Sequence, residues 1–200
     1  MARRACSFCC VFLNLAAIMI PASAAAEPNY VVNVYESAQY YDIEGSTARE
    51  LLDEMNSKGP KRPFGPGAAF GQTEWRISWY VQTETSKDAC ALASADISVE
   101  LTYMMPRWSG SPRASGKLRK TWEAFLASLW VHEKGHGEIA RRGAVAIGEQ
   151  LMAAPRQSSC DALRESLSAI GEQIITDVIK PAQKKYDKLT KDGQTQRTRL

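Results

Sequence analysis

The sequence places His132, Glu133 and His136 in the order His-Glu-x-x-His, within a segment whose apolar pattern is helical. Residues four apart lie on the same face of an α-helix, so both imidazoles can reach one tetrahedral metal ion. Glu133 lies beside that face, where a carboxylate can take a proton from a zinc-bound water. The motif therefore predicts a zinc hydrolase in which His132 and His136 bind Zn²⁺ and Glu133 is the general base.

An ordinary half-buried helix face is the alternative for two histidines at this spacing. The chain contains only two histidines, and both belong to the motif, which favours metal binding. Apolar residues flank the motif, as a buried site helix requires: Leu129, Trp130, Val131 and Ile139. Lys134 adds an unusual charge inside the motif, while Gly135 and Gly137 each lower helix propensity by about 1 kcal/mol relative to Ala. These glycines predict close packing or a nearby backbone.

The first 26 residues have the pattern of a secretory signal peptide. Two arginines precede an apolar run from Cys6 to Ile20, and small residues follow, with cleavage expected after Ala24 or Ala26. An uncleaved membrane anchor is the alternative, but the run is short for a membrane span. We expect an exported protein, periplasmic or secreted, with no stable membrane insertion after cleavage.

Residues 27–200 are expected to form one domain. They carry 23 basic and 22 acidic residues once the two signal arginines are removed, and this balance gives no reason to expect a nucleic-acid partner. Roughly 175 residues are enough for one sizeable core, and no long linker divides them. The sequence does not indicate an oligomeric state.

Two cysteines remain after the predicted signal, Cys90 and Cys160. Export to an oxidising compartment predicts a disulfide between them, and two separate buried thiols are the alternative. Neither is expected to be a nucleophile, because no histidine outside the metal motif exists to activate one. The same shortage excludes a serine triad.

Strands and one helix are expected ahead of the motif. Tyr30 to Tyr35 and Gln39 to Ile43 are rich in aromatic and β-branched residues, which predicts a strand pair or one bent strand. Thr73 to Thr85 and Ala95 to Met105 alternate between apolar and polar residues, so each predicts a half-buried strand, the second ended by Pro106.

A capping-box pattern predicts the one helix of this region. Thr47 is followed three residues later by Glu50, and Lys58, Gly59 and Pro60 are expected to end the helix. Residues 59–71 hold three prolines and four glycines and are expected to be a loop.

Helical patterns occupy most of the remaining chain. The segment from Lys117 to about Gln150 carries both histidines on an apolar stripe. A second helical pattern runs from about Ser159 to Leu189, and Pro181 is expected to bend or interrupt it.

A catalytic zinc usually takes three protein ligands, so a third residue must join the histidines. Glu138 and Glu149 fall off the histidine stripe when the helix is wound at about 100° per residue. The remaining candidates are acids closer to the C-terminus: Glu165, Glu172, Asp177, Asp187 and Asp192.

Several further motifs accompany the histidine motif. They are Tyr41-Asp42-Ile43-Glu44-Gly45-Ser46-Thr47, Phe70-Gly71-Gln72-Thr73-Glu74-Trp75, Trp122, and Tyr186-Asp187-x-x-Thr190. In this order the chain resembles the DUF922 family, described as predicted secreted zinc-dependent proteases of bacteria, from about Tyr30 to Gln196. The resemblance implies an exported bacterial peptidase with Zn²⁺ as cofactor and a peptide or protein as substrate.

The end of the family pattern bears on the third ligand. Members end in Tyr-Asp-x-x-Thr-x-His-Gly-x-x-Gln, and here Asp192 stands where the pattern has histidine. The resemblance implies Asp192 as an oxygen ligand beside His132 and His136, with a helix C-terminal turn as its alternative role. Asp187 has the next claim, either as ligand or as a hydrogen-bond partner of a ligand histidine.

We therefore predict a single α+β domain of zincin-like type: a small, mainly antiparallel sheet packed on a long metal-site helix, plus a C-terminal helix that supplies the third ligand. The expected reaction is peptide-bond hydrolysis, with an extended peptide paired to a sheet edge formed by Ile97 to Met105. The alternative is an exported, non-catalytic binding or assembly protein that retains the fold.

Overall fold

The computed structural model of the chain describes residues 29–61 and 68–193. The predicted signal peptide and residues 62–67 of the predicted Pro/Gly-rich loop lie outside the described residues. The elements are β1 (Tyr30–Ile43), α1 (Ala48–Lys58), β2 (Gln72–Ser86), β3 (Ala89–Trp108), α2 (Gly116–Met152), α3 (Cys160–Ile174), η1 (Ile175–Ile179) and α4 (Lys180–Thr190). The α+β class expected from the sequence is confirmed.

The sheet has three strands in the order β1-β3-β2. β2 and β3 are consecutive and antiparallel, whereas β1 runs parallel to β3 on its other side. The sheet is therefore mixed rather than mainly antiparallel, because the chain returns through α1 and β2 before β3 pairs with β1. β1 is continuous, so the two predicted segments from Tyr30 to Ile43 form one strand.

The position and length of β3 overturn two expectations. Ile97 to Met105 pairs with β1 on one side and with β2 on the other, so this segment is not a sheet edge; the edge strands are β1 and β2. Pro106 also does not end the strand, which continues to Trp108. β2 pairs with β3 only as far as Met104, so Pro106 has one neighbouring strand, and a residue without an N–H is tolerated there.

The predicted capping box opens α1. The Thr47 side chain accepts a hydrogen bond from the Glu50 N–H, and the Glu50 carboxylate accepts from the Ser46 N–H in return. Leu51 and Met55 are fully buried, and the helix ends at Lys58 as expected. This local pattern holds because its hydrogen bonds satisfy donors that a helix start leaves unpaired.

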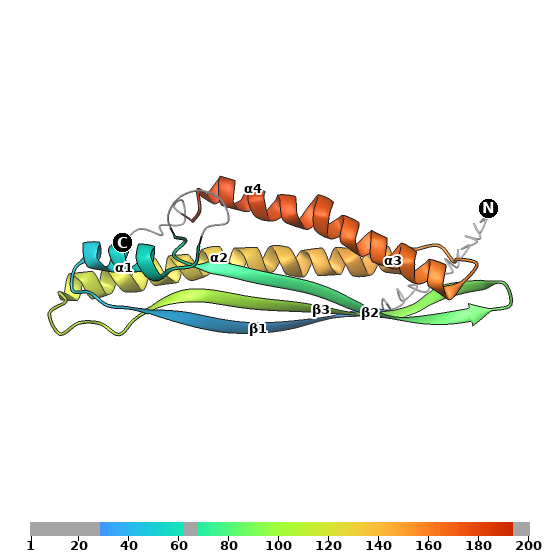
Figure 1. Cartoon of the computed structure of the whole chain (residues 1–200), viewed down its shortest axis with the longest axis horizontal. Helices are drawn as coiled ribbons and strands as arrows, with labels where there is room; N and C mark the ends of the chain where they lie inside the picture. The colour runs from blue at the N-terminus through green and yellow to red at the C-terminus, as the bar shows by residue number, and fades with distance from the viewer. Residues whose placement is uncertain (1–28, 62–67, 194–200) are drawn as a thin grey trace, which may run out of the picture.

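Helix α2 lies along one face of the sheet, and α3, η1 and α4 run back over α2 (Figure 1). The β3 residues beneath α2 form the apolar core, with Ile97, Val99 and Leu101 at most 1% exposed. α2 contributes Phe125 and Ile147, both fully buried. His132 follows the same stripe of α2 and is only 5% exposed.

A disulfide joins Cys90 to Cys160, as expected from the sequence. The main chain of Cys90 also pairs with that of Gln157 in both directions. These links fasten the start of α3 to the β2–β3 hairpin. Among the described residues, no helix has the length and apolar character needed to cross a membrane.

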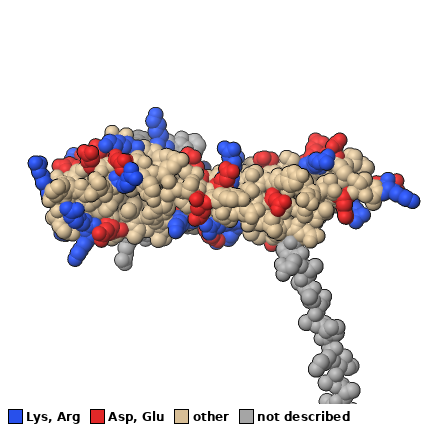
Figure 2. All heavy atoms as spheres, turned by 90° about the horizontal axis from the view of Figure 1, so that it is seen from below, with Lys and Arg blue, Asp and Glu red and all other residues tan. Residues whose placement is uncertain are grey.

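Figure 2 views the molecule from the side of the sheet. Acidic and basic side chains are interspersed on this face rather than gathered by sign. The strands there expose residues of both signs, among them Arg76, Asp96 and Glu100.

Candidate metal centre

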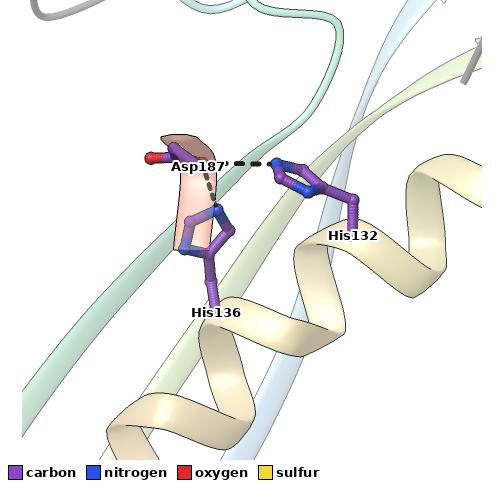
Figure 3. A group of neighbouring side chains, drawn as sticks. All are labelled: His132, His136 and Asp187. Atoms are coloured by element: carbon purple, nitrogen blue, oxygen red, sulfur yellow. Dashed lines mark ion pairs between the residues drawn. The ribbon is translucent and has the colours of Figure 1, made fainter. Parts of the chain in front are cut away.

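Three side chains from two helices converge beside α2. The Nε2 atoms of His132 and His136 lie 3.5 Å and 2.9 Å from Asp187 Oδ1, and the candidate ligand atoms of all three residues lie within 4.8 Å of one another (Figure 3). Three donors bound tetrahedrally to zinc at roughly 2.0–2.1 Å stand roughly 3.3 Å apart, so the spacing fits such an ion. Two imidazole nitrogens and one carboxylate oxygen are also a suitable donor set for zinc.

Side chains of helix α4 contact the Nδ1 atoms of both histidines. Gln183 Oε1 accepts a hydrogen bond from His136 Nδ1 at 2.6 Å, and Gln183 Nε2 donates to the His136 carbonyl at 3.0 Å. Thr190 Oγ1 lies 3.4 Å from His132 Nδ1 and donates its proton to the Tyr186 carbonyl at 2.8 Å. The Nδ1 atoms of both histidines thus face α4, and their Nε2 atoms face Asp187.

Tyr186 packs against both histidines. Its ring is stacked on His132, with centroids 5.2 Å apart and planes 14° apart, and meets His136 edge to face. A side chain at Gly135 would collide with the Tyr186 hydroxyl. The close packing predicted from this glycine is therefore contact with Tyr186, which restricts rotation of the His132 ring.

Glu133 lies in a separate buried recess beside the histidines. It is only 3% exposed, and its Oε2 accepts a 2.6 Å hydrogen bond from Thr73 Oγ1 at the start of β2. A Cβ at Gly71 would stand 2.8 Å from Glu133 Oε1, so glycine there makes room for the carboxylate. Gly71, just before β2, and Thr73, at its start, thus set the position of Glu133.

The charges of this cluster act on one another. Burial raises the pKa of Glu133, while the Thr73 hydrogen bond and the nearby histidines oppose the rise. Burial also disfavours charge on His136, but its hydrogen bonds with Asp187 and Gln183 outweigh burial and raise its pKa. Burial likewise opposes charge on Asp187, yet hydrogen bonds to both histidines hold its pKa far below the usual range. Without metal, the site favours a protonated histidine beside an ionised Asp187.

The structure sorts the predicted acids. Asp187 joins the histidines, whereas Asp192 is not part of this group; it is exposed in the turn after α4, with a φ of 51°. The Asp192 N–H donates to the Asp187 carbonyl at 2.9 Å, which fits the alternative role of a helix C-terminal turn. The ligand role expected for Asp192 stays a prediction. The other candidates, Glu165, Glu172 and Asp177, are exposed and outside the group.

Four contributors to the site were not assigned a role from the sequence. They are Gly71, Thr73, Gln183 and Thr190. Three of them stood in the motifs that carried the family resemblance, which was the available signal. Gln183 carried no signal, because a single glutamine within a helix is unremarkable before its partner helix is known.

The fold and the site together define an α+β protein with a candidate mononuclear metal centre of two histidines and one carboxylate. A family model for bacterial proteins of unknown function, DUF922, matches residues 38–194. The match spans most of the chain, so the chain belongs to the DUF922 family. No curated protein and no solved structure matches it.

Proposed function

We propose that the chain is an exported zinc-dependent peptidase. His132, His136 and Asp187 would hold the metal ion, and Glu133 would be the general base. The observation that carries the proposal is the convergence of both Nε2 atoms on Asp187, with a buried carboxylate on the neighbouring residue of the same helix. The donor set and its spacing fit zinc.

When bound, zinc polarises a carbonyl group and lowers the pKa of a coordinated water to roughly 7. Glu133 would accept the proton of the attacking water and pass it to the leaving amine. Its burial raises its pKa toward the range in which a carboxyl group can both accept and return a proton. Thr73 holds Oε2, which leaves Oε1 for proton transfer.

The start of β2 is suited to bind an extended substrate. β2 is an edge strand, and Gly71, just before it, and Thr73, at its start, border Glu133. A peptide aligned along this edge by main-chain hydrogen bonds would bring one peptide bond close to Glu133. β2 takes the substrate-binding role that the sequence had suggested for Ile97 to Met105.

Export is part of the same proposal. The predicted signal peptide and the Cys90–Cys160 disulfide fit a periplasmic or secreted location. An active site at the surface of such a protein would meet exported peptides or proteins as substrates.

The test compares purified exported protein with its Glu133→Gln variant. Elemental analysis is expected to find one zinc per chain in both, and hydrolysis of an unstructured protein is expected to fall by roughly 100- to 10,000-fold in the variant. Equal activity in the two proteins would refute the proposal. Stoichiometric zinc with no hydrolysis of any peptide in a broad library would favour the non-catalytic alternative.

A further inference from the structure

Along α3, η1 and α4, the residues that face inward follow regular helical spacing as far as α3. From η1 onward, each inward-facing residue comes one position later than that spacing predicts. In α3 the buried residues are Leu163, Leu167 and Gly171. An uninterrupted α-helix would continue this face through Val178, Ala182, Lys185 and Leu189. Every inward-facing position instead comes one residue later: Ile179, Gln183, Tyr186 and Thr190. Val178 and Leu189, which regular periodicity would bury, are 53% and 66% exposed.

The shift arises in η1, which is a turn of π-helix. The Lys180 N–H donates to the Ile175 carbonyl, five residues back, where an α-helix would bond four residues back. The π-turn therefore takes up one extra residue. Pro181 explains its place, because a proline has no N–H for the Asp177 carbonyl and its ring would clash with that carbonyl in a regular helix.

Two glycines of α2 leave space for inward-facing residues of η1 and α4. A side chain at Gly143 would collide with Ile179 Cδ1, and one at Gly135 would collide with the Tyr186 hydroxyl. Ile179 is 1% exposed, so its side chain is fully buried in the space beside Gly143. With these contacts at both ends, the rotation of α4 about its axis is fixed relative to α2.

The same rotation decides which residues face the histidines. Gln183 and Asp187 are four apart and lie on one face of α4, where they contact His136. Without the extra residue, Ala182 would take the position of Gln183 and Tyr186 that of Asp187. Neither replacement supplies the same group, because alanine cannot hold His136 Nδ1 and tyrosine brings no carboxylate.

We propose that the one extra residue of the π-turn Ile175–Ile179 is the positioning device of the metal centre: it rotates α4 so that Gln183 and Asp187 reach His136 and His132. This inference rests on the proposed metal site but not on its catalytic activity. The site depends on how far α4 is rotated about its axis, and the amino-acid type of the extra residue has no part in this. Removing a residue from the π-turn should therefore be tolerated, since a regular α-helix one residue shorter presents the same face.

Two single-residue deletions test this. Val178 and Lys184 are both exposed and lie in the same helical stretch, but only Val178 belongs to the π-turn. Deletion of Val178 is expected to retain one zinc per chain with an affinity within about threefold of wild type. Deletion of Lys184, between Gln183 and Asp187, is expected to lose the zinc. The Val178 deletion is also made with Pro181→Ala, so that a regular helix can form there, whereas the Lys184 deletion keeps Pro181 and with it the π-turn.

Folding is checked by circular dichroism and by the intact Cys90–Cys160 disulfide. A folded Val178 deletion with Pro181→Ala that loses zinc would overturn the inference, as would a Lys184 deletion that binds zinc as tightly as wild type. If the wild type bound no zinc, the proposed function would fail, and the deletions would be compared by NMR. The Nδ1–H signal of His136, one of only two histidines, should then survive deletion of Val178 and vanish on deletion of Lys184.

Discussion

The two ends of the C-terminal helical layer are held in different ways. At the α3 end, a disulfide fastens the helix to the β2–β3 hairpin, and Leu163 and Leu167 are buried in the apolar core. At the α4 end, Gln183 and Asp187 make polar contacts with the histidines of α2, beside the stacked ring of Tyr186. The α3 end is therefore held by a covalent bond and apolar packing alone. The α4 end instead gathers charged groups that a bound cation would stabilise.

The largest expected effect concerns the anchored end. Replacing Cys90 and Cys160 together by serine should lower the free energy of unfolding by about 2–4 kcal/mol, because the disulfide closes a long loop in the unfolded chain. Urea unfolding followed by circular dichroism measures this. Zinc stoichiometry of the folded variant should remain one per chain. Loss of zinc from a folded variant would show that the two ends are not independent.

The next effect concerns the site end alone. Asp187→Asn keeps the shape of the side chain but removes its charge, and should weaken zinc binding by more than about 100-fold, since a ligand should matter more than its supporting hydrogen bonds. Competition with a chromophoric chelator measures the affinity. Asp192→Asn is the matched control and should change the affinity by less than about threefold. The reverse ranking would return the ligand role to Asp192.

A smaller loss is expected from the group that orients His136. Gln183→Leu removes both hydrogen bonds to His136 and should weaken zinc binding by about 10- to 100-fold. Gln183→Glu retains an acceptor for Nδ1 and should lose less. Both affinities are measured by the same competition assay. Equal affinity in Gln183→Leu and wild type would mean that ring packing alone orients the imidazole.

The smallest expected effect is the dependence of zinc affinity on pH. The pKa of His136 is raised in the metal-free site, so a proton must leave before the nitrogen can bind zinc. Below that pKa, zinc affinity should fall about tenfold for each pH unit, which calorimetry at several pH values would measure. An affinity independent of pH between 5 and 7 would contradict a protonated His136 in the metal-free protein.

The same shifts give the metal-free site its own pH window of stability. The raised pKa of His136 contributes stability that is present below its ordinary value of about 6.5 and is lost as pH rises through the raised pKa. The lowered pKa of Asp187 contributes stability that is present above about 3.9 and is lost as pH falls through the lowered pKa. The pair therefore contributes most to stability between these values.

Local patterns predicted most of the elements. The Thr47 capping box, the alternation of β2 and the long helical stripe of α2 were all recognisable, because each depends on neighbours close in sequence. The parallel pairing of β1 with β3 was not recognisable, because it depends on the path of the chain between them. For the same reason the edge strand was placed at β3 rather than at β2.

The sequence by itself determined that two histidines share one helix face with a glutamate beside it, and that two cysteines remain after the predicted signal. Helix geometry and composition suffice for both conclusions. Only the tertiary structure decided which carboxylate meets the histidines. Five acids were open candidates, and Asp187 meets the histidines because of the rotation of α4. That rotation is set by η1 and by the packing of Tyr186 and Ile179 against Gly135 and Gly143, which are contacts between distant segments.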